Sequence, residues 1–221
     1  MKKNVLTLLA VAALTLTACN GNKTSDTDGA MESKEASEAA IKYTVDAENS
    51  LIDWTGGKVA GGNHTGTINL QEGEVFVEEG VVTIGKFVID MGTITVTDLT
   101  EEDGKANLEA HLKGDAEDKA DHFFNVGKFP TATFELVNIN EKDGKTFVEG
   151  NLTMKGQTNA IGFPAAVDVT DTDVIISSEE FEIDRTKWGV NYNSGSVFED
   201  LAGDNIIKDN ITVKLTVKAL K

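Results

Sequence analysis

The sequence predicts an all-β fold, an antiparallel sheet of about eight strands with one short helical insertion. From Ile41 onward, apolar residues recur at every second position, which is the period of half-buried strands. Turn residues such as Glu79-Gly80 and Asp143-Gly144 separate these runs at hairpin spacing. Because strands do not alternate regularly with helices, a parallel sheet is excluded, and either a β-sandwich or a closed barrel remains.

In the first half of the domain, glycines interrupt the strand pattern. The alternation through Tyr43 and Val45 resumes at Ile52 and Trp54, after which the glycines of residues 56–62 predict bends or bulges. These two apolar runs place their side chains on one face of the sheet.

A change of phase marks the strand expected around Gly85. Val82 and Ile84 follow one alternation, whereas Phe87 and Ile89 follow the other. A bulge at Gly85 would account for this shift and turn all four side chains toward the inside of the domain.

Residues 107–121 depart from the strand pattern. They are rich in helix formers, and Leu108 and Leu112 have helical spacing, but Gly114 interrupts them. We therefore expect one or two short helices rather than one long helix. Phe129-Pro130 ends this irregular region, because the residue before a proline avoids the helical conformation.

The second half of the domain returns to regular alternation. Phe134 and Leu136 share one face of a predicted strand, and Phe181 and Ile183 share one face of another. Residues 211–217 alternate strictly between apolar and polar side chains, so this is the clearest strand in the chain.

The corner at residues 184–192 contains charged and aromatic side chains together. Arg185 is suited to pair with a carboxylate and fix a loop, while Trp188 and Tyr192 need partners for their polar atoms when buried. We favour this structural interpretation over direct contact between Arg185 and a ligand head group. Both interpretations stay open at this point.

The N-terminus has the pattern of a bacterial lipoprotein signal. Lys2 and Lys3 precede a short apolar run, and Leu16-Thr17-Ala18-Cys19 resembles a lipobox. Residues 1–18 are predicted to be a signal peptide, and the single cysteine, Cys19, to carry the acyl anchor. We expect an exported lipoprotein, held in the outer membrane and facing the periplasm.

The predicted mature chain has a polar tether followed by an acidic domain. Residues 19–40 comprise the acylated cysteine and a segment with too few apolar side chains to fold alone, and residues 41–221 form one domain. Removal of Lys2 and Lys3 would change the formal charge from −17 to −19. This charge excludes nucleic acid as a partner, and membrane attachment is assigned to the acyl group.

Motifs for catalysis or metal binding are absent from the sequence. His111 and His122 have acidic residues between them, but their spacing matches no tight metal-ligand motif, and His64 lies in a glycine-rich segment. The only cysteine is Cys19, and no Gly-x-Ser-x-Gly or phosphate-binding glycine motif occurs. The sequence therefore predicts neither an enzyme, nor a metal site, nor a cofactor.

Several short motifs follow one another in order along residues 41–221. They are Tyr43-Thr44-Val45-Asp46, Gly62-Asn63-His64-Thr65-Gly66, Phe87-Val88-Ile89-Asp90-Met91, His111-Leu112-Lys113, His122-Phe123-Phe124-Asn125-Val126, Phe129-Pro130-Thr131-Ala132-Thr133-Phe134, Gly150-Asn151-Leu152-Thr153-Met154-Lys155-Gly156, residues 181–190 and Ile207-Lys208-Asp209. Together they resemble the YceI family of bacterial periplasmic polyisoprenoid-binding proteins, and the resemblance spans nearly all of residues 41–221. One departure is that residues 114–120 intervene where the family usually continues directly, and His122 stands where the family commonly has aspartate.

The resemblance implies a lipocalin-like antiparallel β-barrel whose elongated apolar cavity takes an isoprenoid tail. It favours the barrel over the sandwich and gives the apolar alternation a purpose, because barrel interiors receive every second side chain. Residues 114–122 then form an insertion beside the barrel, and Phe123, Phe124 and Phe129 form an apolar plug or rim. The side chains expected to contact the lipid are Trp54, Val82, Ile84, Phe87, Ile89, Phe123, Phe124, Phe134, Leu136, Phe181, Ile183 and Trp188.

The leading hypothesis is a lipid-anchored protein that carries or sequesters an isoprenoid lipid, of the quinone or polyprenyl type, without a covalent bond. The alternative is an interaction or stress-adaptation module whose barrel is filled by side chains. A continuous cavity distinguishes the first hypothesis from the second. The identity of the lipid and the oligomeric state, a homodimer included, stay open.

Overall fold

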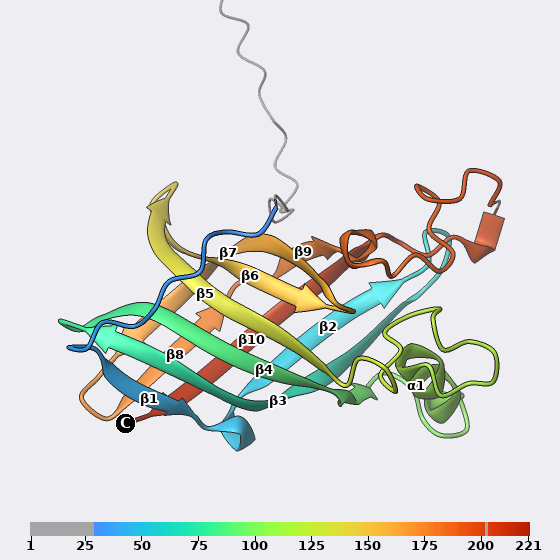
Figure 1. Cartoon of the computed structure of the whole chain (residues 1–221). Helices are drawn as coiled ribbons and strands as arrows, with labels where there is room; N and C mark the ends of the chain where they lie inside the picture. Colours follow the sequence, from blue (N-terminus) through green and yellow to red (C-terminus); the bar gives the residue numbers. More distant parts are fainter. Residues whose placement is uncertain (1–28, 202) are drawn as a thin grey trace, which may run out of the picture.

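The computed structural model describes residues 29–201 and 203–221, and the signal peptide and Cys19 lie outside them. Ten strands form a single antiparallel sheet (Figure 1). One α-helix, α1 (Lys105–Lys113), and three short 3-10 helices, η1 (Ala47–Asn49), η2 (Arg185–Trp188) and η3 (Gly203–Asn205), accompany them. The strands are β1 (Ile41–Val45), β2 (Leu51–Gly57), β3 (Asn63–Glu78), β4 (Val81–Val96), β5 (Thr131–Lys142), β6 (Lys145–Met154), β7 (Gln157–Val169), β8 (Asp173–Ser178), β9 (Phe181–Asp184) and β10 (Asn210–Leu220).

The sheet closes on itself as a barrel. Each strand from β2 to β8 pairs with the next, and β10 pairs with both β2 and β8, so eight strands complete the ring. β9 pairs with the first part of β10, and β1 pairs with β3 and the last residues of β10. The predicted all-β barrel of about eight strands is confirmed, and the sandwich is excluded.

Three hairpins use two-residue turns in which both central residues have positive φ. These turns are Glu79-Gly80, Asp143-Gly144 and Lys155-Gly156, with φ values between 49° and 79°. Positive φ at both positions matches the twist of antiparallel strands, and glycine adopts it without a steric penalty. The first two turns lie where the sequence predicts them, and the third begins one residue earlier than the expected turn at residues 156–159.

The helical insertion is short, as predicted. Gly114 ends α1 in the left-handed conformation at φ 86°, and its N–H donates to the carbonyl of Ala110 at 3.0 Å. Residues 115–130 continue as turns. The helix is held against the barrel because the Val96 N–H donates to Glu109 Oε1 at 2.8 Å. In the described part of the chain, no helix is long and apolar enough to span a membrane.

Side chains fill the barrel at the end that carries the β3–β4 and β7–β8 turns. Val75, Val77 and Val174 are almost fully buried there, and the Tyr43 hydroxyl donates to the carbonyl of Thr170 at 2.9 Å. The opposite end, near α1 and the loop before β10, leads into a cavity. The barrel is therefore solid at one end and hollow at the other.

The expected bulge at Gly85 is displaced toward the N-terminus of β4. Phe76 pairs with Ile84 and Val77 pairs with Val82, so the register shifts between Val82 and Ile84, and Gly85 pairs regularly. Val82 belongs to the core at the solid end of the barrel. Ile84 is only 5% exposed, yet it belongs to neither the core cluster nor the cavity lining. Neither Val82 nor Ile84 lines the cavity, and their expected contact with a lipid stays a prediction.

Residues 29–40 lie across the outer face of the barrel, passing over β7, β6, β5 and β3 in turn (Figure 1). We call this segment the strap. The side chain of Asn151, which is 4% exposed, binds both polar groups of the Met31 backbone: it accepts from the N–H at 2.7 Å and donates to the carbonyl at 2.9 Å. Residues 29–40 of the predicted tether are therefore docked on the barrel.

Replacing Asn151 by alanine is expected to release the strap. The substitution removes both hydrogen bonds to Met31, each worth about 0.5–1.5 kcal/mol. Trypsin should then cleave after the exposed Lys34 about tenfold faster, which corresponds to about 1.4 kcal/mol. Asn140→Ala is the matched control, because Asn140 bonds Glu149 and makes no bond to the strap. Equal cleavage rates for the two variants would show that Asn151 does not hold the strap.

Candidate functional site

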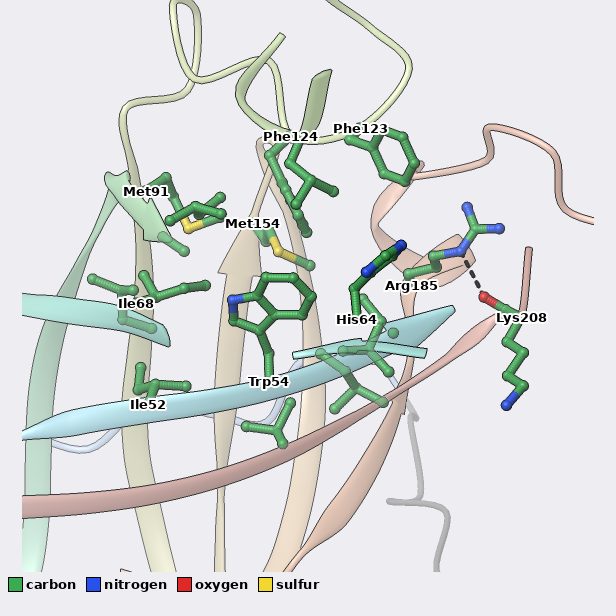
Figure 2. A pocket seen from close by; sticks show the side chains of 18 of the residues that line it. Ile52, Trp54, His64, Ile68, Met91, Phe123, Phe124, Met154, Arg185 and Lys208 are labelled. Carbon is green, nitrogen blue, oxygen red and sulfur yellow. Dashed lines mark hydrogen bonds between the residues drawn. The ribbon is translucent and has the colours of Figure 1, made fainter. Parts of the chain in front are cut away.

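A cavity of about 770 Å³ occupies the hollow part of the barrel, and its walls are predominantly apolar (Figure 2). Strands β2 to β10 supply the walls, while α1 and the loop after it cover part of the open end. Pockets that bury small ligands typically have volumes of about 300–1,000 Å³ and mostly apolar linings. A cavity of this size is inconsistent with a lumen filled by side chains, so the filled-barrel alternative does not fit the structure.

Nine of the twelve predicted side chains line this cavity, whereas Val82, Ile84 and Trp188 do not. Figure 2 shows Trp54 rising from β2 into the cavity beside Ile52. Contact of these nine side chains with a lipid remains a prediction. They are Trp54, Phe87, Ile89, Phe123, Phe124, Phe134, Leu136, Phe181 and Ile183.

Residues of β6 and β7 also line the cavity and escaped the sequence-based prediction. Val148, Leu152 and Met154 alternate along β6, and Ile161 and Phe163 alternate along β7. This period-two pattern is the signal that could have found them. The glycine and asparagine between them made it less evident than the pattern of β10.

Glycines allow two aromatic side chains to lie flat against the barrel wall. A Cβ at Gly66 would lie 2.4 Å from the indole of Trp54, and a Cβ at Gly150 would lie 2.6 Å from the ring of Phe134. Any larger residue at either position would push the ring into the cavity or break the neighbouring strand pairing. The shape of the lumen therefore depends on these two small residues.

An aromatic and imidazole cluster lies between α1 and the loop before β10. The ring of His122 stacks on Tyr192 with centroids 4.0 Å apart, and His111 Nε2 lies 2.8 Å from His122 Nδ1. The rings of His111 and Phe123 also pack edge to face, with their centroids 5.0 Å apart. His111, Phe123 and Tyr192 all line the cavity, so the cluster closes part of its open end.

The pKa of His111 is lowered, first by burial and then by the charges of His122 and Lys119. A hydrogen bond between two imidazoles also requires one ring to present an unprotonated nitrogen. Because the pKa of His111 is lower in the folded protein, the unfolded chain binds a proton at this residue more readily once the pH falls below the ordinary histidine pKa of 6.5. The contribution of His111 to stability is therefore complete above this pH and is lost as the pH falls below it.

We expect the melting temperature to fall between pH 7.5 and pH 5.5, and His111→Gln to make this fall smaller. Glutamine keeps a hydrogen-bonding group but does not titrate. Thermal unfolding of both proteins across this range measures the difference between their pH slopes. Identical slopes would show that His111 does not couple protonation to stability.

The third histidine, His64, pairs with a carboxylate at the open end. His64 Nδ1 lies 2.9 Å from Asp98 Oδ2, and the Thr65 N–H donates to Asp98 Oδ1 at 2.9 Å. Burial acts to raise the pKa of Asp98, but the hydrogen bonds from Thr65, His64 and its own backbone, together with the charge of His64, outweigh it and lower the pKa. His64 also contributes to the cavity lining. Within the described ranges, no three His, Cys, Asp or Glu residues gather in a way that could hold a metal ion.

Arg185 and Trp188 hold the corner beside the cavity. Arg185 is 1% exposed, and its guanidinium donates to the carbonyls of Lys208 at 2.9 Å, Ile207 at 3.2 Å and Val190. Its Nη2 lies 3.5 Å from Asp209 Oδ1. Asp184 instead accepts from the Thr186 N–H and hydroxyl. These bonds fix Arg185 to the loop before β10, and Arg185 also contributes to the cavity lining. Direct contact between Arg185 and a ligand head group stays untested.

Trp188 packs in the core and does not line the cavity, so its expected contact with a lipid stays a prediction. It is fully buried and belongs to the core cluster, and its Nε1 donates to the carbonyl of Leu152 at 2.9 Å. It therefore ties η2 to β6 from a position outside the cavity lining. The sequence marks Trp188 as apolar but does not show on which side of the wall it packs.

Two solved structures share this fold at low sequence identity. BcnA of Burkholderia cenocepacia superposes with a TM-score of 0.56 at 20% identity, covering 79% of this chain and 99% of that one. A polyisoprenoid binding domain from Saccharophagus degradans, implicated in plant cell wall breakdown, gives a TM-score of 0.54 at 14% identity, covering 80% and 97%. At these identities, the likeness establishes the fold alone.

Sequence comparisons identify the family. The chain is 32% identical over 73 residues to a UPF0312 protein of Shewanella sp. (strain W3-18-1), and the match spans 33% of this chain and 35% of that relative. A UPF0312 protein of Shewanella oneidensis is 30% identical over the same length. The model of the YceI-like domain matches residues 43–219, which is most of the chain. The chain thus belongs to the family of YceI-like domains.

Proposed function

We propose that the protein binds an isoprenoid lipid, of the quinone or polyprenyl type, in the barrel cavity without a covalent bond. The observation that carries this proposal is the cavity of about 770 Å³ with its apolar walls, enclosed in a strongly acidic protein. A long hydrocarbon gains about 25 cal/mol for each Å² of apolar surface removed from water, before the cost of ordering is subtracted. Such a lumen can supply that burial for the part of the hydrocarbon that it encloses.

The comparisons support the choice of ligand class. The domain from Saccharophagus degradans, which shares this fold, is described as polyisoprenoid binding. The lining combines aromatic rings with branched aliphatic side chains, which suits the methyl branches and double bonds of an isoprenoid. Stacked rings such as Phe163 and Phe181, with centroids 4.4 Å apart, give the wall a fixed shape.

Anchoring and location form the second part of the proposal. Cleavage before Cys19 and acylation of its thiol would fix the chain to a membrane, with the barrel in the periplasm on the outer-membrane side. The strap would shorten the free tether, because only residues 20–28 separate Cys19 from the docked segment. Carriage or sequestration would then take place close to the bilayer.

A quinone with a short isoprenoid tail tests the binding proposal directly. Trp54 lines the cavity, so a bound quinone is expected to quench its emission saturably, with one molecule per chain and a dissociation constant of about 1 µM or lower. Trp54→Phe reports how much of the quenching comes from this position. Quenching that never saturates, and that an unrelated acidic protein reproduces, would contradict the proposal.

A further inference from the structure

Two loops form the outer rim of the cavity mouth. We call the turn between β2 and β3, together with residues 193–201 and 203–208, the rim loops. The Val59 N–H donates to the carbonyl of Ile206 at 2.9 Å, and Lys58 forms an isolated bridge with Ile207. Both loops contribute to the cavity lining, through Lys58 on one side and Lys208 on the other. The rim loops therefore support one another at the entrance.

These loops expose apolar side chains at the open end of the barrel. Val59 is 61% exposed, Phe198 is 49% exposed and Val197 is 42% exposed. Single exposed apolar residues are common on protein surfaces, but three on the braced loops around the mouth of an apolar cavity call for an explanation.

Hydrogen bonds hold the longer rim loop in the conformation that exposes these residues. The Phe198 N–H donates to the carbonyl of Ser194 at 3.0 Å, and the Ser196 hydroxyl donates to Asp209 Oδ2 at 2.6 Å. Ser194 itself is fully buried. The backbone therefore presents Val197 and Phe198 to the outside while the base of the loop is fixed.

The charges of the rim are mixed, although the whole chain carries −17. Lys58 and Lys208 are exposed on the rim loops, and so are Glu199, Asp200 and Asp204. A surface with both signs complements a headgroup layer of phosphates and amines, whereas a purely anionic layer would repel its carboxylates. The lysine stems can also lie along apolar surface while their ammonium groups stay in water.

We propose that the rim loops insert Val59, Val197 and Phe198 into a zwitterionic lipid bilayer, so that the cavity opens toward the lipid phase. This inference rests on the proposed function and adds where the ligand enters. Each methylene of a long lipid that passes through water carries a free-energy cost, so an entrance seated in the bilayer shortens that path. The apolar residues would reach the acyl boundary and the flanking charges the headgroups.

A cysteine label on the rim tests this inference. In a chain of residues 20–221, which lacks the predicted signal peptide and the only native thiol, Val197→Cys is labelled with an environment-sensitive fluorophore and mixed with phosphatidylcholine vesicles free of isoprenoids. Val81→Cys is the matched control, because Val81 is 60% exposed but follows the β3–β4 turn at the opposite end of the barrel. The label at 197 should shift to shorter wavelength, and the label at 81 should not.

Adding Phe198→Ser to the labelled Val197→Cys chain should weaken vesicle binding about fivefold or more, because an apolar ring no longer enters the bilayer. An unshifted label at 197, or equal shifts at 197 and 81, would overturn the inference. These vesicles contain no ligand, so the result is independent of the quinone titration. Insertion without quinone binding would refute the proposed function, whereas quinone binding without insertion would refute only the entrance.

Discussion

Replacing Arg185 by methionine is expected to lower the free energy of unfolding by about 3–5 kcal/mol. Methionine keeps the apolar stem but leaves three carbonyl groups, those of Lys208, Ile207 and Val190, without their donor. It also leaves Asp209, which is 24% exposed, without its counter-ion. Burial of unpaired acceptors and of a lone charge is among the most destabilising changes in a protein interior. Chemical denaturation of both proteins measures the loss.

Two further variants distinguish the effect of the buried Arg185 guanidinium from that of an ordinary exposed ion pair. Lys145 Nζ lies 2.6 Å from Glu179 Oε1, but both side chains are about half exposed. Lys145→Met should therefore lower the free energy of unfolding by no more than about 1 kcal/mol. Arg185→Lys should recover only part of the loss, because an ammonium group cannot reproduce the planar set of donors. A loss below about 1 kcal/mol for Arg185→Met would contradict this account of the corner.

Blocking the lumen is expected to weaken isoprenoid binding at least tenfold, which corresponds to about 1.4 kcal/mol. Ala132 and Val148 line the cavity from neighbouring strands β5 and β6, and replacing both by phenylalanine would place two rings where the ligand lies. Because the rings enter empty space and not a filled core, the free energy of unfolding should fall by no more than about 1.5 kcal/mol. Quinone titration and denaturation of the double variant measure both effects.

The control for the blocked lumen lies on the other face of the same strand. Thr133 alternates with Ala132 along β5 and is absent from the cavity lining, so Thr133→Phe adds the same ring outside the barrel. This variant should bind quinone as the wild type does. Equal loss of binding in the control and the blocked variant would show that the effect does not come from the lumen.

Much of the fold follows from the local alternation of apolar residues. The period-two pattern places Phe134 and Leu136 on the cavity side of β5, and residues 211–217 lie within β10, the strand that closes the barrel. The glycine turns are also local, because positive φ is a property of two residues. Periodicity alone did not decide between a sandwich and a barrel, because closure depends on the pairing of β8 with β10 across the chain.

The position of a bulge is not a local property. The phase change around Gly85 indicates that one residue is inserted in β4, but the insertion falls between Val82 and Ile84. Val82 then packs in the core at the solid end, whereas Ile84 lies outside both the core cluster and the cavity lining. Which residue is displaced depends on pairing with β3, and the sequence of β4 does not contain that information.

The strap shows where composition misleads. Residues 29–40 bury little apolar surface, so their composition predicts a disordered segment. Asn151 on β6 nevertheless binds the backbone of Met31, and backbone groups are the same in every residue of the strap. Asn151 lies 120 residues from Met31 in the chain, so the sequence of the strap alone does not predict that it docks on the barrel.

The most direct test of the central claim is the lipid content of the protein itself. The full-length protein and its Ala132→Phe, Val148→Phe variant are purified in parallel from bacterial membranes, extracted with solvent, and compared by mass spectrometry. The account predicts an isoprenoid lipid at about one molecule per wild-type chain, strongly reduced in the blocked variant. An empty wild-type cavity, or the same lipids in equal amounts in both proteins, would contradict it.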